Sequence, residues 1–465
     1  MDYCRMRAGL RKSLAAGLLS ASALAPVAAL AQETLEQRLD RLEAMIMQMQ
    51  ARMDAAQGTA AAASPADAAM AREMRAAVAE TRAVAAEQGE IRERVARIEA
   101  DDKKGFRVGA TQFTIGGYVK MDAISQRTSG GEVPGDSINR DFLIPSLIPV
   151  GGSASGWDTH FHARQSRVIL KAETPVGGKT LGGHLELDFL VTSGGDQRVS
   201  NSYTPRMRQA FLTYDGWTFG QAWSTFQNVS ALPDSVDFVG TMPGTVFVRQ
   251  PMIRYQAKSG LSFAVEQPET TITNASGGRI LPADDKLPDI IVRYDVKGFA
   301  LAGIVRQLHA SAADLGAASG DSAFGYGVSL SGKVPVGDKD DVRFMGTVGQ
   351  GLGRYMGANI VNDAAIDLDG ELDPITTYSG FAAFRHVWND KLRSNVAGSY
   401  FKADNPVALT GAGATDSVWN ALANVIYSPV PKLDLGLEYM YAERENEGGA
   451  SGNLQKVQVT AKYSF

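Results

Sequence analysis

The sequence predicts an all-β transmembrane barrel of sixteen antiparallel strands, preceded by an α-helical coiled-coil arm. In residues 455–465 the side chains alternate strictly, with Val457, Tyr463 and Phe465 on one face and Lys456 and Lys462 on the other. A strand of about ten residues with one apolar and one polar face suits a wall between lipid and water. Long and short connections between the predicted strands also alternate. After residue 31, no segment has the roughly 18 consecutive apolar residues of a spanning helix. Taken alone, this last strand could also be the edge of a soluble β-sandwich.

Residues 1–31 have the features of a secretory signal peptide. Four basic residues within positions 5–12 precede a short apolar core, and Ala-Leu-Ala at 29–31 supplies a cleavage site. Cleavage would also remove Cys4, the only cysteine, so the mature chain has no disulfide and no thiolate metal ligand. Because the leader carries four basic residues and one acidic residue, the net charge of −5 for the full chain becomes −8. A membrane anchor is the alternative, although Pro26 interrupts the apolar stretch.

Residues 32–104 are predicted to form a coiled-coil arm in the periplasm. Its first half carries apolar residues at spacings of three and four, namely Leu35, Leu39, Leu42, Ile46, Met49 and Met53. Residues 57–67 contain Gly58 and Pro65 and form a linker, and a weaker apolar seam follows over 70–98. For this second half a disordered, alanine-rich spacer is the alternative. An apolar seam needs partner helices, and copies of the same chain are the simplest partners.

Residues 105–465 are predicted to form the barrel, because the apolar period changes here from 3.5 to 2. The sixteen predicted strands are residues 113–123, 162–172, 184–189, 206–214, 217–223, 252–258, 261–266, 289–296, 299–307, 323–334, 341–350, 377–388, 392–401, 418–427, 433–442 and 455–465. An even number of strands places both ends of the barrel on one side of the membrane. Residues 210–212 are apolar on both faces, which indicates either a subunit contact or a shifted register.

The connections support a membrane barrel over a soluble sandwich. Turn residues fill short connections such as 215–216 and 297–298. Long segments rich in Gly, Asp, Ser and Ala separate the other strand pairs, at 125–160, 192–204, 225–251, 268–288, 308–322, 351–376, 402–417 and 443–454. Short periplasmic turns and long external loops are typical of a barrel in the outer membrane of a Gram-negative cell. The last strand resembles the C-terminal strands of such barrels, which implies the barrel-assembly machinery and outer-membrane lipid as partners.

Sixteen strands enclose a water-filled lumen, so transport is the predicted function. Counting in steps of two places seven basic residues on the water side: Lys120, Arg167, Lys171, Arg254, Arg293, Arg306 and Arg343. Arg206 and Arg208 share a face with each other, and Arg164 lies near the head of its strand. Arginines in a constriction select anions, because each guanidinium can bind a carboxylate or phosphate through two parallel hydrogen bonds. We expect the permeant to meet six of these residues, namely Lys120, Arg167, Arg206, Arg208, Arg254 and Arg293. The alternative is that the lumen arginines pair with lumen acids such as Glu186, Asp188, Asp295 and Glu438.

The segment between the fifth and sixth predicted strands is the candidate constriction loop. It runs from Trp223 to Arg249 and contains Asp234, Asp237 and Phe238. If this loop folds inward it narrows the lumen, and Asp234 and Asp237 would then set the size limit. The alternative is an ordinary external loop.

The sequence offers little evidence for enzyme chemistry, and we predict no catalytic, cofactor, metal or nucleic-acid site. His160 and His162 could point the same way as a metal pair, but no third ligand is near them in the sequence. The other three histidines stand alone. No G-x-S-x-G motif or phosphate-binding loop is present.

The chain resembles the DcaP-like outer-membrane porins. The resemblance depends on the arm, on Gly116 to Asp122, on Arg164-Gln165-Ser166-Arg167, on residues 185–189, and above all on Arg206 to Phe211 leading to Gly220 to Phe226. It implies a homotrimer of sixteen-stranded barrels, held partly by an N-terminal three-helix coiled coil, and uptake of small anions, notably dicarboxylates. The external loops show no such resemblance.

The resulting hypothesis is a trimeric, passive porin for small anionic solutes. A phosphate-selective or general diffusion pore is one alternative. A structural tether, in which the arm binds the cell wall and the pore is incidental, is an alternative of another class.

Overall fold

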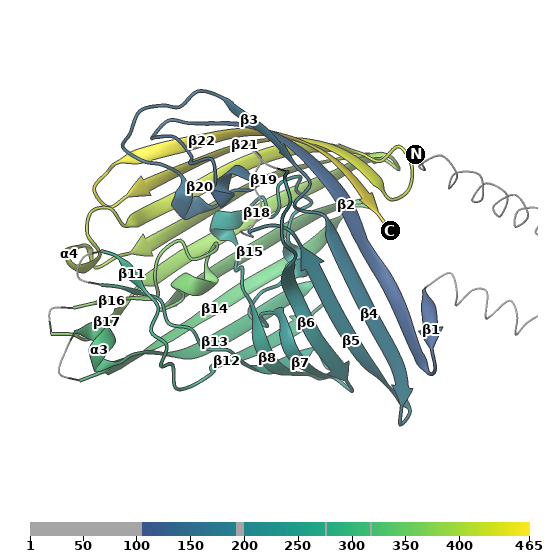
Figure 1. The fold of residues 1–465 in the computed structure, drawn as a ribbon, viewed down its shortest axis with the longest axis horizontal. Helices are drawn as coiled ribbons and strands as arrows, with labels where there is room; N and C mark the ends of the chain where they lie inside the picture. The colour runs from purple at the N-terminus through teal and green to yellow at the C-terminus, as the bar shows by residue number, and fades with distance from the viewer. Residues whose placement is uncertain (1–104, 192–199, 275–276, 317–318, 368) are drawn as a thin grey trace, which may run out of the picture. The chain divides into compact units, whose positions relative to one another are not determined.

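The described part of the chain forms a closed antiparallel β-barrel. The computed structural model describes residues 105–191, 200–274, 277–316, 319–367 and 369–465. Eighteen strands belong to the barrel sheet, and β2 pairs with β22 to close it (Figure 1). In chain order they are β1 (Phe106–Val108), β2 (Thr111–Thr128), β3 (Asp158–His162), β4 (Arg167–Val176), β5 (Lys179–Asp188), β6 (Arg206–Tyr214), β7 (Trp217–Trp223), β8 (Arg249–Gln256), β9 (Leu261–Glu266), β12 (Asp289–Val296), β13 (Phe299–Ala310), β14 (Asp321–Val336), β15 (Asp340–Gln350), β18 (Thr376–Asn389), β19 (Leu392–Asp404), β20 (Thr415–Tyr427), β21 (Leu433–Asn446) and β22 (Ser451–Ser464).

These eighteen strands fill sixteen positions around the wall. β3 and β4 both pair with β2, at residues 122–126 and 112–118, so they share one position that is interrupted at residues 163–166. β1 pairs with the first residues of β2, on the edge that β22 occupies further along. The predicted sixteen-stranded antiparallel barrel is therefore confirmed, and every predicted strand overlaps an observed one.

The long connections carry the remaining short elements. A four-stranded sheet consists of β10 (Ile272–Thr273), β11 (Arg279–Ile280), β16 (Ala364–Ile366) and β17 (Leu372–Pro374). The helices are α3 (Ala312–Leu315) and α4 (Val407–Thr410), and the 3-10 turns are η1 (Ile138–Arg140), η2 (Pro145–Leu147), η3 (Val229–Ala231), η4 (Met242–Gly244) and η5 (Gly353–Tyr355). In Figure 1, α3, α4, β11, β16 and β17 gather at one end of the barrel. No helix in the described ranges has the length and apolarity needed to cross a membrane.

Side chains sort between the two faces of the wall as the alternation predicts. On β22, Val459 and Tyr463 are 50% and 53% exposed on the outer face, whereas Lys456 and Gln458 are each 1% exposed on the inner face. Exposed aromatic residues form a belt near the short turns, which comprises Trp217, Tyr255, Tyr294, Trp388, Tyr427 and Tyr463, and another near the long loops, which comprises Phe324, Tyr326, Tyr378, Tyr400 and Trp419. Two aromatic belts around an apolar outer band are what a lipid bilayer stabilises.

Two expectations about the wall need correction. The predicted long loop at 443–454 is a tight turn, because β21 and β22 stay paired to Glu445 and Ser451 and leave only residues 447–450 unpaired. Long and short connections therefore do not alternate without exception. The predicted strand 162–172 is interrupted at 163–166, where the amide of Ser166 donates to the carbonyl of Ala163 in a turn, at 3.0 Å.

Gly117 allows β2 to bend where β3 gives way to β4. Its φ is +138°, and a Cβ at this position would lie 2.1 Å from the carbonyl oxygen of Arg167 on the neighbouring strand. We expect Gly117→Ala to lower the free energy of unfolding by about 1–3 kcal/mol, because both the backbone conformation and the close approach require glycine. The measurement is the urea midpoint of the barrel refolded in detergent. Gly346→Ala is the matched control, since a Cβ there meets nothing within 4 Å; equal midpoints for the two variants would contradict the prediction.

The signal peptide predicted over 1–31 and the coiled-coil arm predicted over 32–104, with its linker at 57–67, lie outside the described residues.

Candidate functional site

The connection between β7 and β8, residues 224–248, lies inside the barrel and is called here the inner loop. Its backbone is held by strands that come much later in the chain. The carboxylate of Glu438 on β21 accepts the amides of Val236 and Asp237, at 2.8 and 3.1 Å. On β20, Asn424 donates to the carbonyl of Asp234 at 2.9 Å. The inner loop is thus fixed to the wall by polar side chains that the alternation had placed on the inner face.

Lys120 on β2 is one of the anchors of the inner loop. Its ammonium donates to the carbonyl of Val236 at 2.8 Å and to Gln165 at 2.7 Å, and it forms an ion pair with Asp122 at 3.1 Å. The residue is only 5% exposed. This corrects the expectation that Lys120 attracts the permeant: the inner loop covers it.

The two acids of the inner loop bond cations of the wall. Asp237 is 3% exposed, pairs with Lys456 of β22, and accepts the amide of Leu143 at 3.2 Å. Burial raises the pKa of Asp237, but Lys456 and two loop amides outweigh this, so its pKa lies below the ordinary value. Asp234 is half-buried and forms an ion pair with Arg393 of β19 at 2.6 Å. Both carboxylates thus attach the loop to the wall, and their part in setting the size limit stays a prediction.

Three arginines of β4 and β6 converge on two carboxylates of β5. Arg208 of β6 pairs with Glu186 and, at 2.7 Å, with Asp188, both on β5. Arg206 makes two hydrogen bonds of 2.9 Å to Asp188. Arg167 of β4 lies 3.2 Å from Glu186. These five residues, Arg167, Arg206, Arg208, Glu186 and Asp188, are called the arginine cluster; three guanidiniums against two carboxylates leave it with a formal positive charge.

A β-bulge places Arg208 in the arginine cluster. The pairing of β5 with β6 shifts between Glu186 and Leu187, so Leu187 faces Met207 while Glu186 faces Gln209. Arg208 is the extra residue, and both it and Gln209 turn inward to bond the carboxylate of Glu186. Beyond the bulge the side chains alternate again, with Leu212 exposed and the ring of Phe211 stacked on that of His184, 4.7 Å between ring centres.

Aromatic rings connect the arginine cluster to the inner loop. The guanidinium of Arg208 lies 5.1 Å from the ring centre of Phe238 and 5.8 Å from that of Trp223. Arg249 lies 4.7 Å from the ring centre of Trp223. At such distances a cation is attracted by the ring face. Phe238 and Arg249, both expected to belong to the constriction, thus lie beside the cluster.

The remaining predicted arginines lie nearer the short turns. Arg293 pairs with Asp295 at 2.6 Å and donates to the carbonyl of Gln227, also at 2.6 Å, so it too anchors the inner loop. Arg254 is half-buried, and its Nε has no hydrogen-bond partner among the described residues. Of the predicted permeant-binding residues, the structure brings Arg167, Arg206 and Arg208 together and places Lys120, Arg254 and Arg293 elsewhere.

A second inward connection, residues 351–375, was not foreseen as part of the constriction. Its Tyr355 is fully buried and donates to Asp289 of β12 at 2.6 Å. Arg306 of β13 pairs with Asp289 at 3.3 Å and with Asp363 at 2.8 Å, and its side chain has no exposed surface. Arg306 is therefore structural and not a lining residue of the lumen. The sequence signal for this network was weak, because its members come from three separate segments.

The connections also enclose a cavity of about 730 Å³ among residues of the long loops. Arg279 and Arg444 line it, and none of its lining residues is an aspartate or glutamate. Arg444 is fixed by donating to the carbonyls of Ser146 and Ile148, at 2.8 and 3.1 Å. The charged side chains that line this cavity are therefore both cationic.

Glu438 gives a direct test of how the inner loop is held. We expect Glu438→Leu to increase the single-channel conductance and its noise, because two loop amides lose their acceptor at about 1–3 kcal/mol. Planar bilayer recording measures both quantities. Glu443→Leu, on the same strand but bonded to Tyr441 at 2.7 Å, is the control. If the Glu438→Leu channel has the single-channel conductance and the current noise of the wild type, the anchoring role is refuted.

Comparisons with known proteins agree with this architecture. A family model described as DcaP outer membrane protein matches residues 122–465. The crystal structure of the outer membrane channel DcaP of Acinetobacter baumannii is similar at 25% identity, with a TM-score of 0.63, and the alignment covers 78% of this chain and 99% of that chain. Weaker similarities include OmpT of Vibrio cholerae, at 14% identity, a TM-score of 0.46 and coverage of 77% and 99%, and an anion-selective porin from Comamonas acidovorans, at 12%, 0.48, and 76% and 100%. No curated protein sequence matches the chain.

Proposed function

Because the chain belongs to the DcaP outer membrane protein family, it is an outer-membrane channel, and we propose that it carries small anionic solutes by passive diffusion. The arginine cluster is the observation that supports the anion preference. Its three guanidiniums exceed its two carboxylates, and the inner loop lies against them through Phe238. A net positive charge at a narrow, poorly hydrated place attracts anions and repels cations.

Dicarboxylates are the proposed permeants. The Arg167 and Arg206 side chains keep 17% and 22% of their surface exposed, more than the 2% of Arg208. Nε of Arg167 has no partner among the described residues, and Arg206 bonds Asp188 through Nε and Nη2. Arg208 thus neutralises the acids from the buried side, while two partly exposed guanidiniums remain for the two ends of a dicarboxylate.

The size limit is assigned to two segments acting together, the inner loop and residues 351–375. They meet where Val246 and Met356 form an isolated β-bridge, and where the amide of Phe247 donates to the carbonyl of Tyr355 at 2.9 Å. Two mutually bonded connections resist displacement by a passing solute better than one. The proposed pore therefore passes small solutes only.

Reversal potential and current block test this function. In a tenfold KCl gradient across a planar bilayer, the sign of the reversal potential is expected to show preference for chloride. Succinate is expected to reduce the chloride current at lower concentration than phosphate does. A cation-selective potential would overturn the proposal. Anion selectivity with stronger block by phosphate would favour a phosphate pore, and no block by either would favour general diffusion.

We also propose that the channel is a homotrimer with a periplasmic arm, as the resemblance to the family implies. The test is the mass of the detergent-solubilised protein, from light scattering, with and without residues 32–104. A monomeric mass for both proteins would exclude the trimer.

A further inference from the structure

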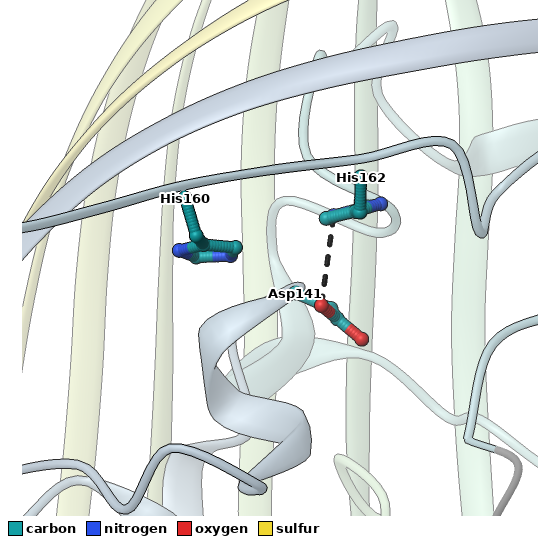
Figure 2. A group of neighbouring side chains, drawn as sticks. All are labelled: Asp141, His160 and His162. Atoms are coloured by element: carbon teal, nitrogen blue, oxygen red, sulfur yellow. Dashed lines mark ion pairs between the residues drawn. The ribbon is translucent and has the colours of Figure 1, made fainter. Parts of the chain in front are cut away.

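One cluster of metal-ligating side chains lies apart from the arginine cluster. Asp141 follows η1 in the connection 129–157, and His160 and His162 lie on β3 with one residue between them. One ligand atom from each of the three residues lies within 4.8 Å of the others (Figure 2). No third ligand for the histidine pair could be predicted from the sequence, because Asp141 is brought to it only when the long connection folds back over β3.

Both histidines are buried with few polar contacts. His160 is 4% exposed and His162 is 8% exposed. Among the residues that the structure describes, the nitrogens of His162 have no hydrogen-bond partner, and His160 interacts with the backbone of Arg140. The nearest carboxylates lie 3.9 Å from His160, at Asp158, and 3.7 Å from His162, at Asp141. Buried ring nitrogens without partners are costly unless something binds them.

The charges around the cluster leave one carboxylate oxygen available. Arg164 bonds Oδ2 of Asp141 at 2.6 Å, whereas Oδ1 points to Nε2 of His162. The other nearby cations are paired elsewhere: Arg140 with Asp158 at 2.7 Å, Lys120 with Asp122 at 3.1 Å, and Lys456 with Asp237. Metal–ligand bonds of about 2.0–2.1 Å in tetrahedral geometry place neighbouring ligand atoms roughly 3.3 Å apart. The 3.7 Å between Oδ1 and Nε2 is therefore close to the separation that a metal requires.

We propose that Asp141, His160 and His162 bind a divalent transition metal, with Zn²⁺ the expected ion. Two imidazoles and one carboxylate are ligands that Zn²⁺ accepts, whereas Ca²⁺ and Mg²⁺ prefer oxygen ligands alone. Water would complete the coordination. Because Arg164 orients the carboxylate through its second oxygen, it acts as an outer support for the ligand.

Metal binding at this cluster would fix an external connection to the inner loop. Phe142, next to Asp141, packs on Phe238 with ring centres 5.0 Å apart. The amide of Leu143 donates to Asp237, which belongs to the inner loop. A metal ion that links Asp141 to β3 would therefore also restrain Phe142 and Leu143, the two residues that contact the inner loop.

The test is calorimetric titration of Zn²⁺ into the untagged protein in detergent after removal of metals with EDTA. We expect one Zn²⁺ per chain. His160→Phe and His162→Phe keep a ring of similar size and are each expected to weaken binding more than about 100-fold, beyond the loss typical of an outer support. His386→Phe is the matched control, since that ring bonds Asp340 at 2.7 Å near a short turn. Co²⁺ serves as a second probe, and its visible absorption reports nitrogen and oxygen ligands.

The outcomes separate a metal site from two buried structural histidines. One Zn²⁺ per chain that is lost in both variants and kept in His386→Phe supports the site. No Zn²⁺ binding by the wild type, or binding that both variants retain, overturns it. Should the phenylalanine variants fail to fold, Asp141→Asn is measured instead: a loss of about tenfold or more supports the assignment, and unchanged affinity refutes it.

Discussion

The double variant Arg167→Gln/Arg206→Gln is expected to lose the anion preference of the channel. Both side chains are partly exposed, and their removal changes the arginine cluster from three cations and two anions to one cation and two anions. A unit charge changes the energy of an ion 4 Å away by about 1 kcal/mol in a water-like medium, which is a factor of about five in the occupancy of that ion. Losing two charges would lower the occupancy of the anion by about 25-fold and raise that of the cation, and the resulting change in the anion-to-cation permeability ratio is measured as reversal potential in asymmetric KCl.

The control for this variant removes two positive charges from outside the lumen. Arg127 lies on the outer face of β2 and bonds Gln455 at 3.0 Å, and Lys179 pairs with Asp215 at a short turn. Arg127→Gln/Lys179→Gln has the same formal charge as the test variant and should keep the wild-type potential. If both variants shift the potential equally, net charge and not the cluster controls selectivity.

Arg208→Met is expected to prevent stable folding, whereas replacement of the partly exposed Arg167 and Arg206 is not. Arg208 is 2% exposed, and without it the charges of Glu186 and Asp188 are opposed by Arg167 and Arg206, which are partly exposed. Removing one partner from a buried ion pair costs about 3–5 kcal/mol, a large share of the stability of a typical domain. The measurement is the fraction of refolded protein that migrates as the compact form on an unheated gel, together with its urea midpoint.

A compensating variant distinguishes buried charge from loss of packing. Glu186→Gln/Asp188→Asn/Arg208→Met removes the buried charges together and keeps similar shapes, while Arg167 and Arg206 stay charged but partly exposed, so it should regain most of the stability that Arg208→Met loses. If it unfolds as easily as the single variant, the contacts of Arg208 with Phe238 and Trp223 carry the stability instead.

The wall of the barrel could be predicted from the sequence because it depends on local alternation. Within each strand, successive side chains alternate between the face toward lipid and the face toward water. On β22, Val459 lies on the outer face and Gln458 on the inner face. The prediction was wrong where the signal was composition alone. The glycine-rich run before Ser451 suggested a long loop, but cross-strand pairing continues to Glu445 and leaves only a tight turn.

The interior could be predicted only in part, because each side chain there depends on partners from distant segments. Alternation correctly placed Lys120 and Arg306 on the inner side, yet it does not show that the inner loop covers Lys120 or that Asp289 and Asp363 enclose Arg306. Nor does it show the bulge at Arg208, which a single extra residue creates. Asp141 joins His160 and His162 for the same reason, through tertiary folding of a long connection.

The anchoring of the inner loop determines the order in which the channel can assemble. The amide of Val236 bonds a carboxylate that lies 202 residues further along the chain, and the partner of Asp237 on β22 lies 219 residues further. Contacts between residues so far apart in the sequence form late in folding. The chain loses conformational entropy on closing the long loop before the contact itself adds any stability. The bore therefore reaches its working width only when β21 and β22 are in place, and the pairing of β22 with β2 is also what closes the barrel.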